Sequence, residues 1–358
     1  MKDQFHGLLL NSKIYPLEEL IDYSQKAIAS KDVPEWKKNV FQFLITWLDD
    51  KDYIMQYSSG TTGSPKELKL SKDSMIKSAQ KTCDYFHLRF GQTASLCLPI
   101  EYIAGKMMVV RAFVGGLNLT LTEPTSMPDL SGMGKIDFCA MVPLQVFNSL
   151  NSIEALRNVR KLIIGGAEIR DELEVMLRDL PNEVYATYGM AETCSQVAIR
   201  RISGTEYERY YTSLPGVSFD VDERECLIIH ANYLDHKVIT NDVVDLVDDN
   251  RFRWIGRYDN LINSGGVKIV PEEVEAVISK TTGFDCAIIG VPDTKLGQKL
   301  VLVLEKGGGE LGADELKNTL KEELPRHLQP KDIVYVDQIP RNSSFKVDRH
   351  KLLLQLNQ

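Results

Sequence analysis

Short apolar runs alternate with helix-like stretches along the first half of the chain, and this alternation limits the possible folds more than any other feature. The runs that we interpret as strands are Tyr53–Tyr57, Ala94–Leu98, Leu117–Leu121, Phe138–Val142, Lys161–Ile164 and Glu183–Thr187. Amphipathic stretches typical of helices precede and separate them: Leu17–Ile28, Val40–Leu48, Ser74–Phe86, Lys106–Val114 and Arg170–Leu180. Strands that alternate with helices favour an α/β fold with mainly parallel sheets covered by helices.

The second half of the chain follows a different pattern. From about Thr212 the expected strands are short and alternating (Cys226–His230, Val243–Val247 and Arg251–Ile255), which predicts a small antiparallel subdomain. A compact α+β unit is expected beyond it, in the order helix Pro271–Lys280, strands Cys286–Val291 and Leu300–Glu305, helix Ala313–Leu324 and strand Asp332–Val336. We therefore predict a large domain over residues 1–258 and a small mobile domain over residues 259–358.

Composition and charge narrow the classes of partner. A hydrophobic share of 43% and a charged share of 26% are typical of a globular protein, and the net charge of -8 disfavours a nucleic-acid-binding face. No apolar stretch reaches membrane-spanning length, and the first residues do not form a signal peptide. Six scattered cysteines without a C-x-x-C pair indicate a reducing compartment. We expect a cytoplasmic protein without nucleic-acid partners or stable membrane insertion.

A run rich in glycine and hydroxyl groups, Tyr57–Lys66, follows the first predicted strand. Glycines let the backbone approach an anion, and successive N–H groups and hydroxyls can surround phosphate oxygens. It is not a P-loop, because Pro65 stands where a second glycine is required. A plain polar turn is the alternative to a phosphate site. The residues predicted to hold phosphate, besides Lys66, are Ser58, Ser59, Gly60, Thr61, Thr62 and Gly63.

This run resembles the phosphate-loop signature of the adenylate-forming superfamily, which comprises acyl-CoA synthetases, luciferases and peptide-synthetase adenylation domains. Further motifs similar to that family follow in its order: Gly165–Ala167, Thr187–Thr193, Thr240–Asp242, Gly256–Asp259, Asn263–Val274 and Ile339–Arg349. Three positions depart from the family pattern, because Ala191 replaces a threonine and Asn241 and Phe345 each replace a glycine. The resemblance implies a large α/β domain followed by a small mobile one.

The resemblance also implies a nucleotide site. Tyr188 would stack on adenine, Asp242 would accept both ribose hydroxyls, and Arg257 would contact the ribose or a phosphate. Glu192 would hold Mg²⁺, because a carboxylate beside a triphosphate is otherwise repelled by it. The other residues that the resemblance assigns to ATP or AMP are Gly165, Gly166, Ala167 and Gly189.

Catalysis and domain movement are implied in the same way. Lys346 would be the catalytic lysine, assisted by Lys66 and Glu192, and Asp259 would be the hinge about which the small domain turns. A two-glycine turn would let the pantetheine arm of CoA approach closely, so the residues assigned to the CoA side are Gly265, Gly266 and Lys268. A plain hairpin turn is the alternative for these glycines.

The chemistry implied by the resemblance is ligation of an acid to CoA in two steps. The acid's carboxylate attacks the α-phosphorus of ATP, and the thiol of CoA then displaces AMP. The stretch Thr187–Gln196 is most similar to the o-succinylbenzoate–CoA ligases of menaquinone biosynthesis, and only about fifty residues precede the phosphate loop. Such a substrate carries a second carboxylate, for which the candidate pocket residues are Tyr102, Lys106, Ser195 and Gln196. For Lys106 a solvated helix position is the alternative.

Other functions stay open at this point. The chain could ligate another aryl or acyl acid to CoA, or load a carrier protein as an adenylation enzyme. In a different class, Ala191 and Phe345 would mark a non-catalytic nucleotide-binding relative. The expected partners are the acid, ATP and CoA, and the sequence leaves a homodimer open.

Overall fold

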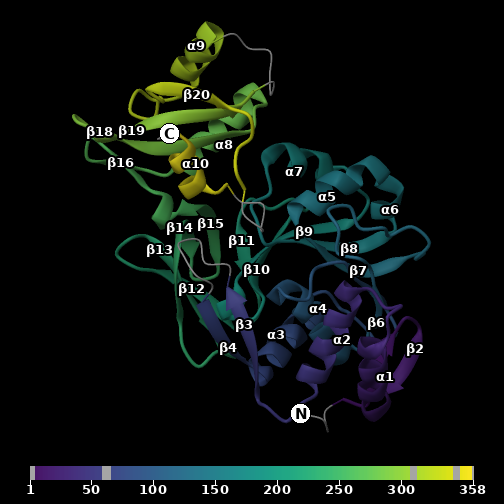
Figure 1. The fold of residues 1–358 in the computed structure, drawn as a ribbon. Helices are drawn as coiled ribbons and strands as arrows, with labels where there is room; N and C mark the ends of the chain where they lie inside the picture. The colour runs from purple at the N-terminus through teal and green to yellow at the C-terminus, as the bar shows by residue number, and fades with distance from the viewer. Residues whose placement is uncertain (1–4, 59–65, 307–312, 342–346, 357–358) are drawn as a thin grey trace. The chain divides into compact units, whose positions relative to one another are not determined.

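The computed structural model describes residues 5–58, 66–306, 313–341 and 347–356 (Figure 1). The chain divides into two compact units. Unit 1 comprises residues 1–169, 173–218 and 230–238, and unit 2 comprises residues 170–172, 219–229 and 239–358. The boundary at residues 258 and 259 stays a prediction. Within the described residues, no helix is long and apolar enough to cross a membrane.

A mainly parallel sheet forms the centre of unit 1, as predicted. Its parallel strands are β5 (Thr93–Leu96), β6 (Asn118–Leu121), β7 (Ile136–Met141), β8 (Val159–Ile164) and β9 (Glu183–Gly189). Strand β10 (Gln196–Arg201) pairs antiparallel with β9, and β11 (Tyr211–Ser213) with β10. A hairpin that was not predicted, β1 (Gly7–Leu10) and β2 (Lys13–Pro16), extends the other edge beside β6. Near-continuous burial along β7 and β8 is the pattern of a sheet covered on both faces.

Helices cover both faces of this sheet. One group contains α1 (Leu17–Ala29), α2 (Glu35–Trp47), α3 (Lys72–Tyr85) and α4 (Ile103–Gly115), and the other contains α5 (Pro143–Ser149) and α6 (Ile153–Arg157), while α7 (Asp171–Arg178) follows β8 (Figure 1). Every side of α4 is buried over most of its length, which fits its run of apolar residues. One residue in that buried run, Arg111, is charged.

The prediction for the strand at Tyr53–Tyr57 was wrong in one respect. The strand forms as β3 (Tyr53–Ser58), but it pairs antiparallel with β4 (Lys66–Ser71) in a separate two-stranded ribbon rather than joining the parallel sheet. Its side chains alternate between buried and less buried positions, the pattern of a strand with one covered face. Because β4 was not recognised as a strand, no local partner for β3 was available to the sequence argument.

Unit 2 contains the small α+β fold and most of the residues in the antiparallel strands that precede it. Strands β12 (Val217–Val221), β13 (Cys226–Ala231), β14 (Val238–Asp248) and β15 (Arg251–Arg257) lie in that order, and β14 pairs antiparallel with β15. The predicted antiparallel character is confirmed, although β14 is an 11-residue strand rather than a short one.

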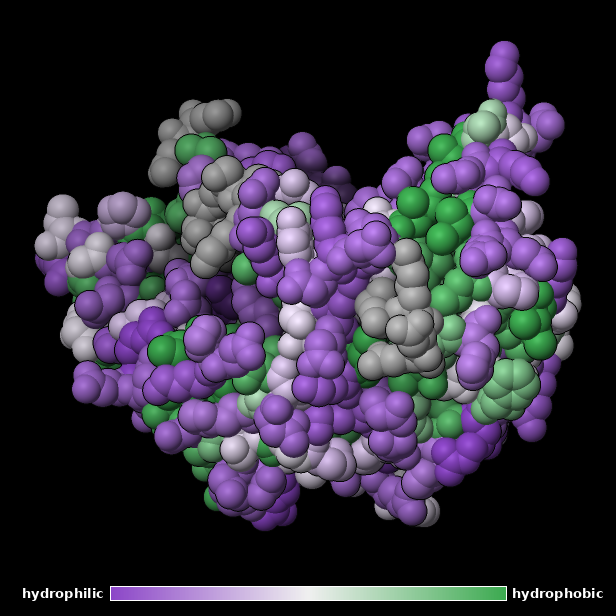
Figure 2. Space-filling view, turned by 90° about the horizontal axis from the view of Figure 1, so that it is seen from below, coloured by the Kyte–Doolittle hydropathy of each residue, from purple (hydrophilic) through white to green (hydrophobic). Residues whose placement is uncertain are grey.

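The order of elements predicted after residue 270 is confirmed. Helix α8 (Pro271–Thr282) is followed by β18 (Cys286–Asp293), β19 (Gly297–Glu305), α9 (Ala313–Glu323) and β20 (Asp332–Val336). An unpredicted hairpin, β16 (Ile262–Ser264) and β17 (Val267–Ile269), precedes them, and α10 (Arg349–Leu356) follows. Two apolar clusters, one involving α8 and α9 and the other α10, pack on the sheet. The face drawn in Figure 2 is mainly hydrophilic, with hydrophobic side chains in scattered groups.

Candidate nucleotide and acid site

The β3–β4 ribbon brings together the two ends of the predicted phosphate loop. Ser58 and Lys66 are direct register partners, so the backbone on either side of the loop is fixed by strand pairing. The loop itself, residues 59–65, lies outside the described residues. The assignments of Ser59, Gly60, Thr61, Thr62 and Gly63 therefore stay predictions.

The motifs assigned to adenine meet at one edge of the unit 1 sheet. Strands β8 and β9 are parallel neighbours, so Gly165, which follows β8, and Tyr188, in the last residues of β9, lie at the same end of the sheet. The hydroxyl of Thr187 donates to the carbonyl of Ile164 at 3.2 Å. A Cβ atom at Gly165 would lie 2.4 Å from that hydroxyl, so a larger residue at this position would displace the Thr187 side chain and break its hydrogen bond to Ile164. The structure thus brings Gly165 and Tyr188 to the same sheet edge.

A tight turn after β9 places Glu192. A Cβ atom at Gly189 would lie 2.3 Å from the carbonyl oxygen of Ser195, which shows how closely the chain returns on itself. The short 3₁₀ turn Ala191–Thr193 is held by Thr193, whose hydroxyl accepts from the backbone N–H of Met190 at 3.0 Å. Glu192 is partly exposed and forms no hydrogen bond or ion pair with the residues that the structure describes.

The most unusual polar group in unit 1 is Arg111, which the sequence analysis did not identify. It lies on α4, is 2% exposed, and has no carboxylate within ion-pairing distance in the described part of the chain. One terminal nitrogen, Nη2, donates to the hydroxyl of Ser195 and, at 2.6 Å, to the side-chain oxygen of Gln196. Its Nε has no hydrogen-bond partner among the described groups. Burial lowers the pKa of Arg111 to about 10, against the opposing influence of Cys83.

Ser195 and Gln196, predicted to lie in the acid pocket, are the residues that hold this guanidinium. The amide nitrogen of Gln196 donates to the hydroxyl of Thr82 at 2.9 Å, which fixes its oxygen towards Arg111. A buried cation without a counter-charge costs several kcal/mol, on the order of the usual penalty for an unpaired buried ion. This arrangement is suited to receive an anionic group. A charged residue inside the apolar run of α4 was the sequence signal for it.

Lys106 is not the solvated helix residue that the sequence offered as an alternative, while its assignment to the acid pocket stays a prediction. It is half-buried, and its Nζ donates to the side-chain oxygen of Gln56 at 2.5 Å and to the carbonyl of Glu101 at 3.2 Å. Burial lowers the pKa of Lys106 to about 8, with Glu101 acting in the opposite direction. Gln56 precedes the end of β3, so Lys106 links the strand before the phosphate loop to α4. Tyr102, just before α4, is 39% exposed.

In unit 2, strand pairing joins the motifs assigned to the ribose. Asp242 on β14 and Arg257 on β15 are register partners. The Asp242 carboxylate accepts from the indole nitrogen of Trp254 at 3.2 Å, and Arg257 Nη1 lies 3.5 Å from the same oxygen. The other terminal nitrogen of Arg257 donates to Asp259 at 2.7 Å. Trp254 was missed by the sequence analysis, since a lone tryptophan in a strand usually reports only packing.

The predicted CoA-side glycines form a hairpin turn. Gly265 and Gly266 connect β16 and β17 with φ angles of 62° and 84°, as a two-residue hairpin turn with left-handed central residues requires. The ammonium group of Lys268 lies 5.6 Å from the centroid of the Tyr258 ring. The assignment of these residues to CoA stays a prediction. Lys346 and Phe345 lie outside the described residues.

Family comparison agrees with the motif order. The model of the AMP-binding enzyme family matches residues 15–228, and that of the AMP-binding enzyme C-terminal domain matches residues 273–346. The chain belongs to the AMP-binding enzyme family. The 2-succinylbenzoate–CoA ligase of Lactococcus lactis subsp. lactis (strain IL1403) is 24% identical over 98% of this chain and 82% of its own. The ligase of the same name from Listeria monocytogenes serotype 4b (strain F2365) is 27% identical over 94% of this chain and 77% of its own.

Solved structures of this AMP-binding enzyme family share the fold. An acyl-CoA synthetase (AMP-forming)/AMP-acid ligase II-like protein from Dyadobacter fermentans is 34% identical, with a TM-score of 0.60 over 93% of this chain and 97% of that one. The o-succinylbenzoate CoA synthetase of Bacillus subtilis, in complex with its acyl-adenylate intermediate, gives a TM-score of 0.76 at 16% identity, over 97% of this chain and 94% of that one. The predicted α/β fold class is confirmed.

No group of three or more metal-ligating side chains occurs among the described residues of this AMP-binding enzyme. The single carboxylate of Glu192 nevertheless fits a hard cation such as Mg²⁺, which in nucleotide sites is bound by one or two carboxylates plus phosphate oxygens and water. All six cysteines are buried, and the structure shows each as a free thiol.

Proposed function

We propose that this AMP-binding enzyme is an ATP-dependent acid–CoA ligase that converts o-succinylbenzoate to o-succinylbenzoyl-CoA, a step of menaquinone biosynthesis. The names of the two bacterial ligases quoted above support this substrate. The structural observation that carries the proposal is the buried, carboxylate-free guanidinium of Arg111.

The proposed chemistry starts with two anions that must meet. The reacting carboxylate attacks the α-phosphorus of ATP and pyrophosphate leaves, so catalysis depends on positioning and charge neutralisation. We assign this neutralisation to Lys346, to the loop Ser58–Lys66 and to Mg²⁺ held by Glu192. The thiol of CoA then displaces AMP from the acyl-adenylate, on the side that we assign to Gly265, Gly266 and Lys268.

A dicarboxylate substrate also carries a carboxylate that does not react, and we assign the binding of this group to Arg111. The carboxylate that does not react must leave water when the acid enters its pocket, and burying it without a partner would be costly. A guanidinium that already lies buried, with Ser195 and Gln196 fixing one edge, supplies that charge. An acid with a single carboxylate would leave the cation unpaired, which favours o-succinylbenzoate over benzoates and fatty acids.

The nucleotide assignments are part of the same proposal. Tyr188 would contact adenine, Asp242 the ribose hydroxyls, and Arg257 the ribose or a phosphate. Asp259 would be the hinge that lets Lys346 serve adenylation and then withdraw for the CoA step. We also propose a cytoplasmic location, which the buried unpaired cysteines support. A homodimer stays a prediction.

A substrate screen tests the proposal. Purified protein with ATP, Mg²⁺ and CoA would receive o-succinylbenzoate, benzoate, a fatty acid or an amino acid, and pyrophosphate release and thioester formation would be measured. We expect o-succinylbenzoate to give both products at the highest kcat/KM. Faster turnover of a fatty acid or benzoate would overturn the substrate, pyrophosphate release without thioester would favour a carrier-loading enzyme, and no turnover of any acid would favour a non-catalytic relative.

A further inference from the structure

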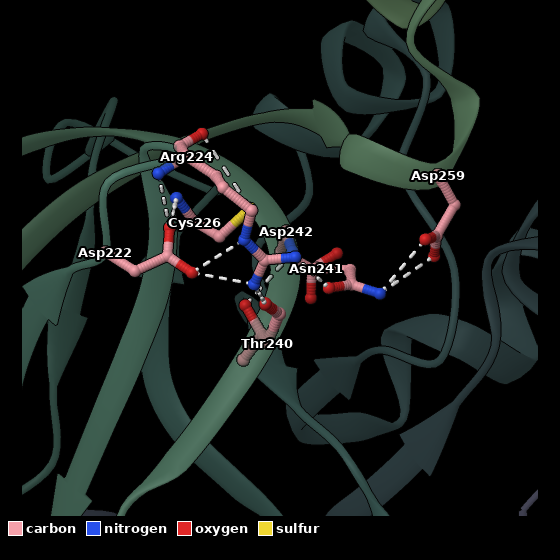
Figure 3. Close-up of polar contacts among 7 residues, drawn as sticks. All are labelled: Asp222, Arg224, Cys226, Thr240, Asn241, Asp242 and Asp259. Carbon is pink, nitrogen blue, oxygen red and sulfur yellow. Dashed lines mark hydrogen bonds and ion pairs between the residues drawn. The ribbon is translucent and has the colours of Figure 1, made fainter.

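The proposed hinge carboxylate, Asp259, is bound by two residues of unit 2, Asn241 and Arg257, of which Figure 3 draws Asn241. The amide nitrogen of Asn241 donates to both of its oxygens, at 3.0 and 3.2 Å. Arg257 adds a hydrogen bond at 2.7 Å. The side chain of Asp259 is 30% exposed, so these contacts are only partly screened by water.

The orientation of the Asn241 amide is set by Arg224. Arg224 Nη1 donates to the side-chain oxygen of Asn241 at 2.9 Å, and Nη2 donates to the backbone carbonyl of Thr240 at 3.2 Å (Figure 3). A guanidinium can only donate hydrogen bonds, so the amide oxygen must face it and the amide NH₂ must face Asp259. The reversed amide would place two donors against each other and two acceptors against each other.

Arg224 is itself fixed by Asp222 in the β12–β13 turn. Its Nε and Nη2 donate to one oxygen of Asp222 at 2.8 and 2.7 Å. The other oxygen of Asp222 accepts backbone N–H groups of Arg224 and Cys226 at 2.8 and 3.0 Å. Although partial desolvation acts in the opposite direction, the hydrogen bonds from Arg224 lower the pKa of Asp222. The carboxylate is therefore ionised at neutral pH, and the chain of contacts is Asp222, Arg224, Asn241 and Asp259.

We propose that Asn241 is a positioning residue that restrains the hinge and couples it to the ribose site. This inference rests on the proposed function, in which Asp259 is the pivot and Asp242 binds ribose. Asn241 immediately precedes Asp242, so the residue that binds the hinge carboxylate is joined directly to the residue assigned to the ribose. The family motif has glycine at this position, which has no side chain to reach the hinge. A turn about Asp259 must break both Asn241 hydrogen bonds.

The restraint is tested first by hydrogen exchange of the hinge amides. The backbone N–H of Leu261, which donates to the carbonyl of Tyr258 at 3.2 Å, reports the hinge, and the β14 amides of Val243 and Val244 report the fold. Asn241→Asp keeps the side-chain shape and an acceptor for Arg224, but faces Asp259 with a like charge. We expect exchange at Leu261 to become about fivefold faster, because two hydrogen bonds to a partly exposed carboxylate are lost.

Two further variants complete the test. Asn241→Gly restores the family residue and should accelerate exchange at Leu261 by about threefold, since it removes the hydrogen bonds without adding repulsion. Asn250→Asp is the matched control, because Asn250 also donates to a neighbouring aspartate, Asp249 at 2.7 Å, on the β14–β15 turn. It should leave exchange at Leu261 unchanged. Wild-type exchange in Asn241→Asp, or equal acceleration at Val243 and Val244, would overturn the proposal.

Kinetics connect the restraint to turnover. With o-succinylbenzoate, the ratio of CoA-thioester formation to ATP–pyrophosphate exchange should change by about threefold or more in Asn241→Asp and stay at the wild-type value in Asn250→Asp. A wild-type ratio in Asn241→Asp would refute the coupling. If no acid supported turnover, the proposed function would fail, while the hydrogen-exchange result would still decide whether Asn241 restrains the hinge segment.

Discussion

Arg111 in unit 1 and Arg224 in unit 2 are held in opposite ways. Arg224 grips the carboxylate of Asp222 through two nitrogens and is 36% exposed in its side chain. Arg111 is almost fully buried and contacts only uncharged groups among the described residues, chiefly Ser195 and Gln196. A guanidinium whose charge is already paired with a carboxylate in its own turn has a structural role, because it fixes the side chains around it. A guanidinium buried among neutral acceptors is instead suited to bind a charge that arrives with a ligand.

The largest expected effect comes from removing the unpaired charge. Arg111→Met keeps a long apolar side chain and should raise the KM for o-succinylbenzoate at least about hundredfold, the scale of losing one partner of a buried ion pair. The KM for ATP should stay within about twofold. Steady-state kinetics check this, with Arg224→Met as the comparison.

The same variants separate a binding role from a structural one. Arg111→Met should not lower the thermal midpoint, because removing an uncompensated buried charge offsets the loss of its hydrogen bonds to Ser195 and Gln196. Arg224→Met should lower the thermal midpoint, because it removes the hydrogen bonds to Asp222 and Asn241, and should leave the KM for the acid unchanged. Equal loss of activity towards o-succinylbenzoate and benzoate in Arg111→Met would contradict a role in binding the second carboxylate.

An internal counter-charge should make Arg111 a paired arginine, like Arg224. In Gln196→Glu, a carboxylate replaces the amide oxygen that lies 2.6 Å from the guanidinium. We expect the KM for o-succinylbenzoate to rise about thirtyfold, because the substrate would compete with a permanent ion pair whose strength is on the order of 2 kcal/mol. The protein should unfold at a higher temperature.

The control for this substitution is Gln42→Glu, which makes the same change in charge on the exposed surface of α2. It should alter neither the KM for the acid nor the unfolding temperature by a comparable amount. An unchanged KM in Gln196→Glu would show that the acid does not depend on a free charge at Arg111.

The sequence predicted the fold well where one local pattern decided the outcome. The β5–β9 strands, the helix beginning at Pro271 and the two-glycine turn at Gly265 follow directly from apolar periodicity, proline placement and glycine conformational freedom. The β3 strand was placed in the wrong sheet because its partner, β4, carries a weak strand pattern in Lys66–Ser71. Pairing between segments depends on tertiary context that periodicity does not contain.

The site was predictable only in part, for a related reason. Motifs identified Asp242 and Arg257, but only the β14–β15 register shows that Trp254 shares the Asp242 carboxylate. Arg111 carries no motif, and its meaning comes from the absence of a carboxylate around it in the described structure, which is a property of packing. Sequence patterns report which groups are present, whereas the balance of charge around a buried group appears only after folding.

The smallest expected effect concerns Lys106. It is half-buried, and so intermediate in exposure between Arg111 and Arg224, and its ammonium group is bound by neutral oxygens. Burial lowers the pKa of Lys106 to about 8 from its ordinary 10.5. Between these pH values the unfolded chain binds more protons than the folded chain, so the stability of the wild type rises with pH across this window. The Lys106→Met variant has no ionisable group at this position, so its stability lacks this rise with pH.

The stability advantage of Lys106→Met over the wild type should therefore be greatest near pH 7 and shrink between pH 8 and 10.5, by about 1 kcal/mol after allowance for solvent screening. Urea unfolding at several pH values measures it. Lys77→Met, on the exposed surface of α3, serves as the control and should show no such change. A constant difference across the window would mean that Lys106 stays charged in the folded protein. It would then rank beside Arg111 as a candidate receptor for the second carboxylate, and the KM of Lys106→Met for o-succinylbenzoate would become the deciding measurement.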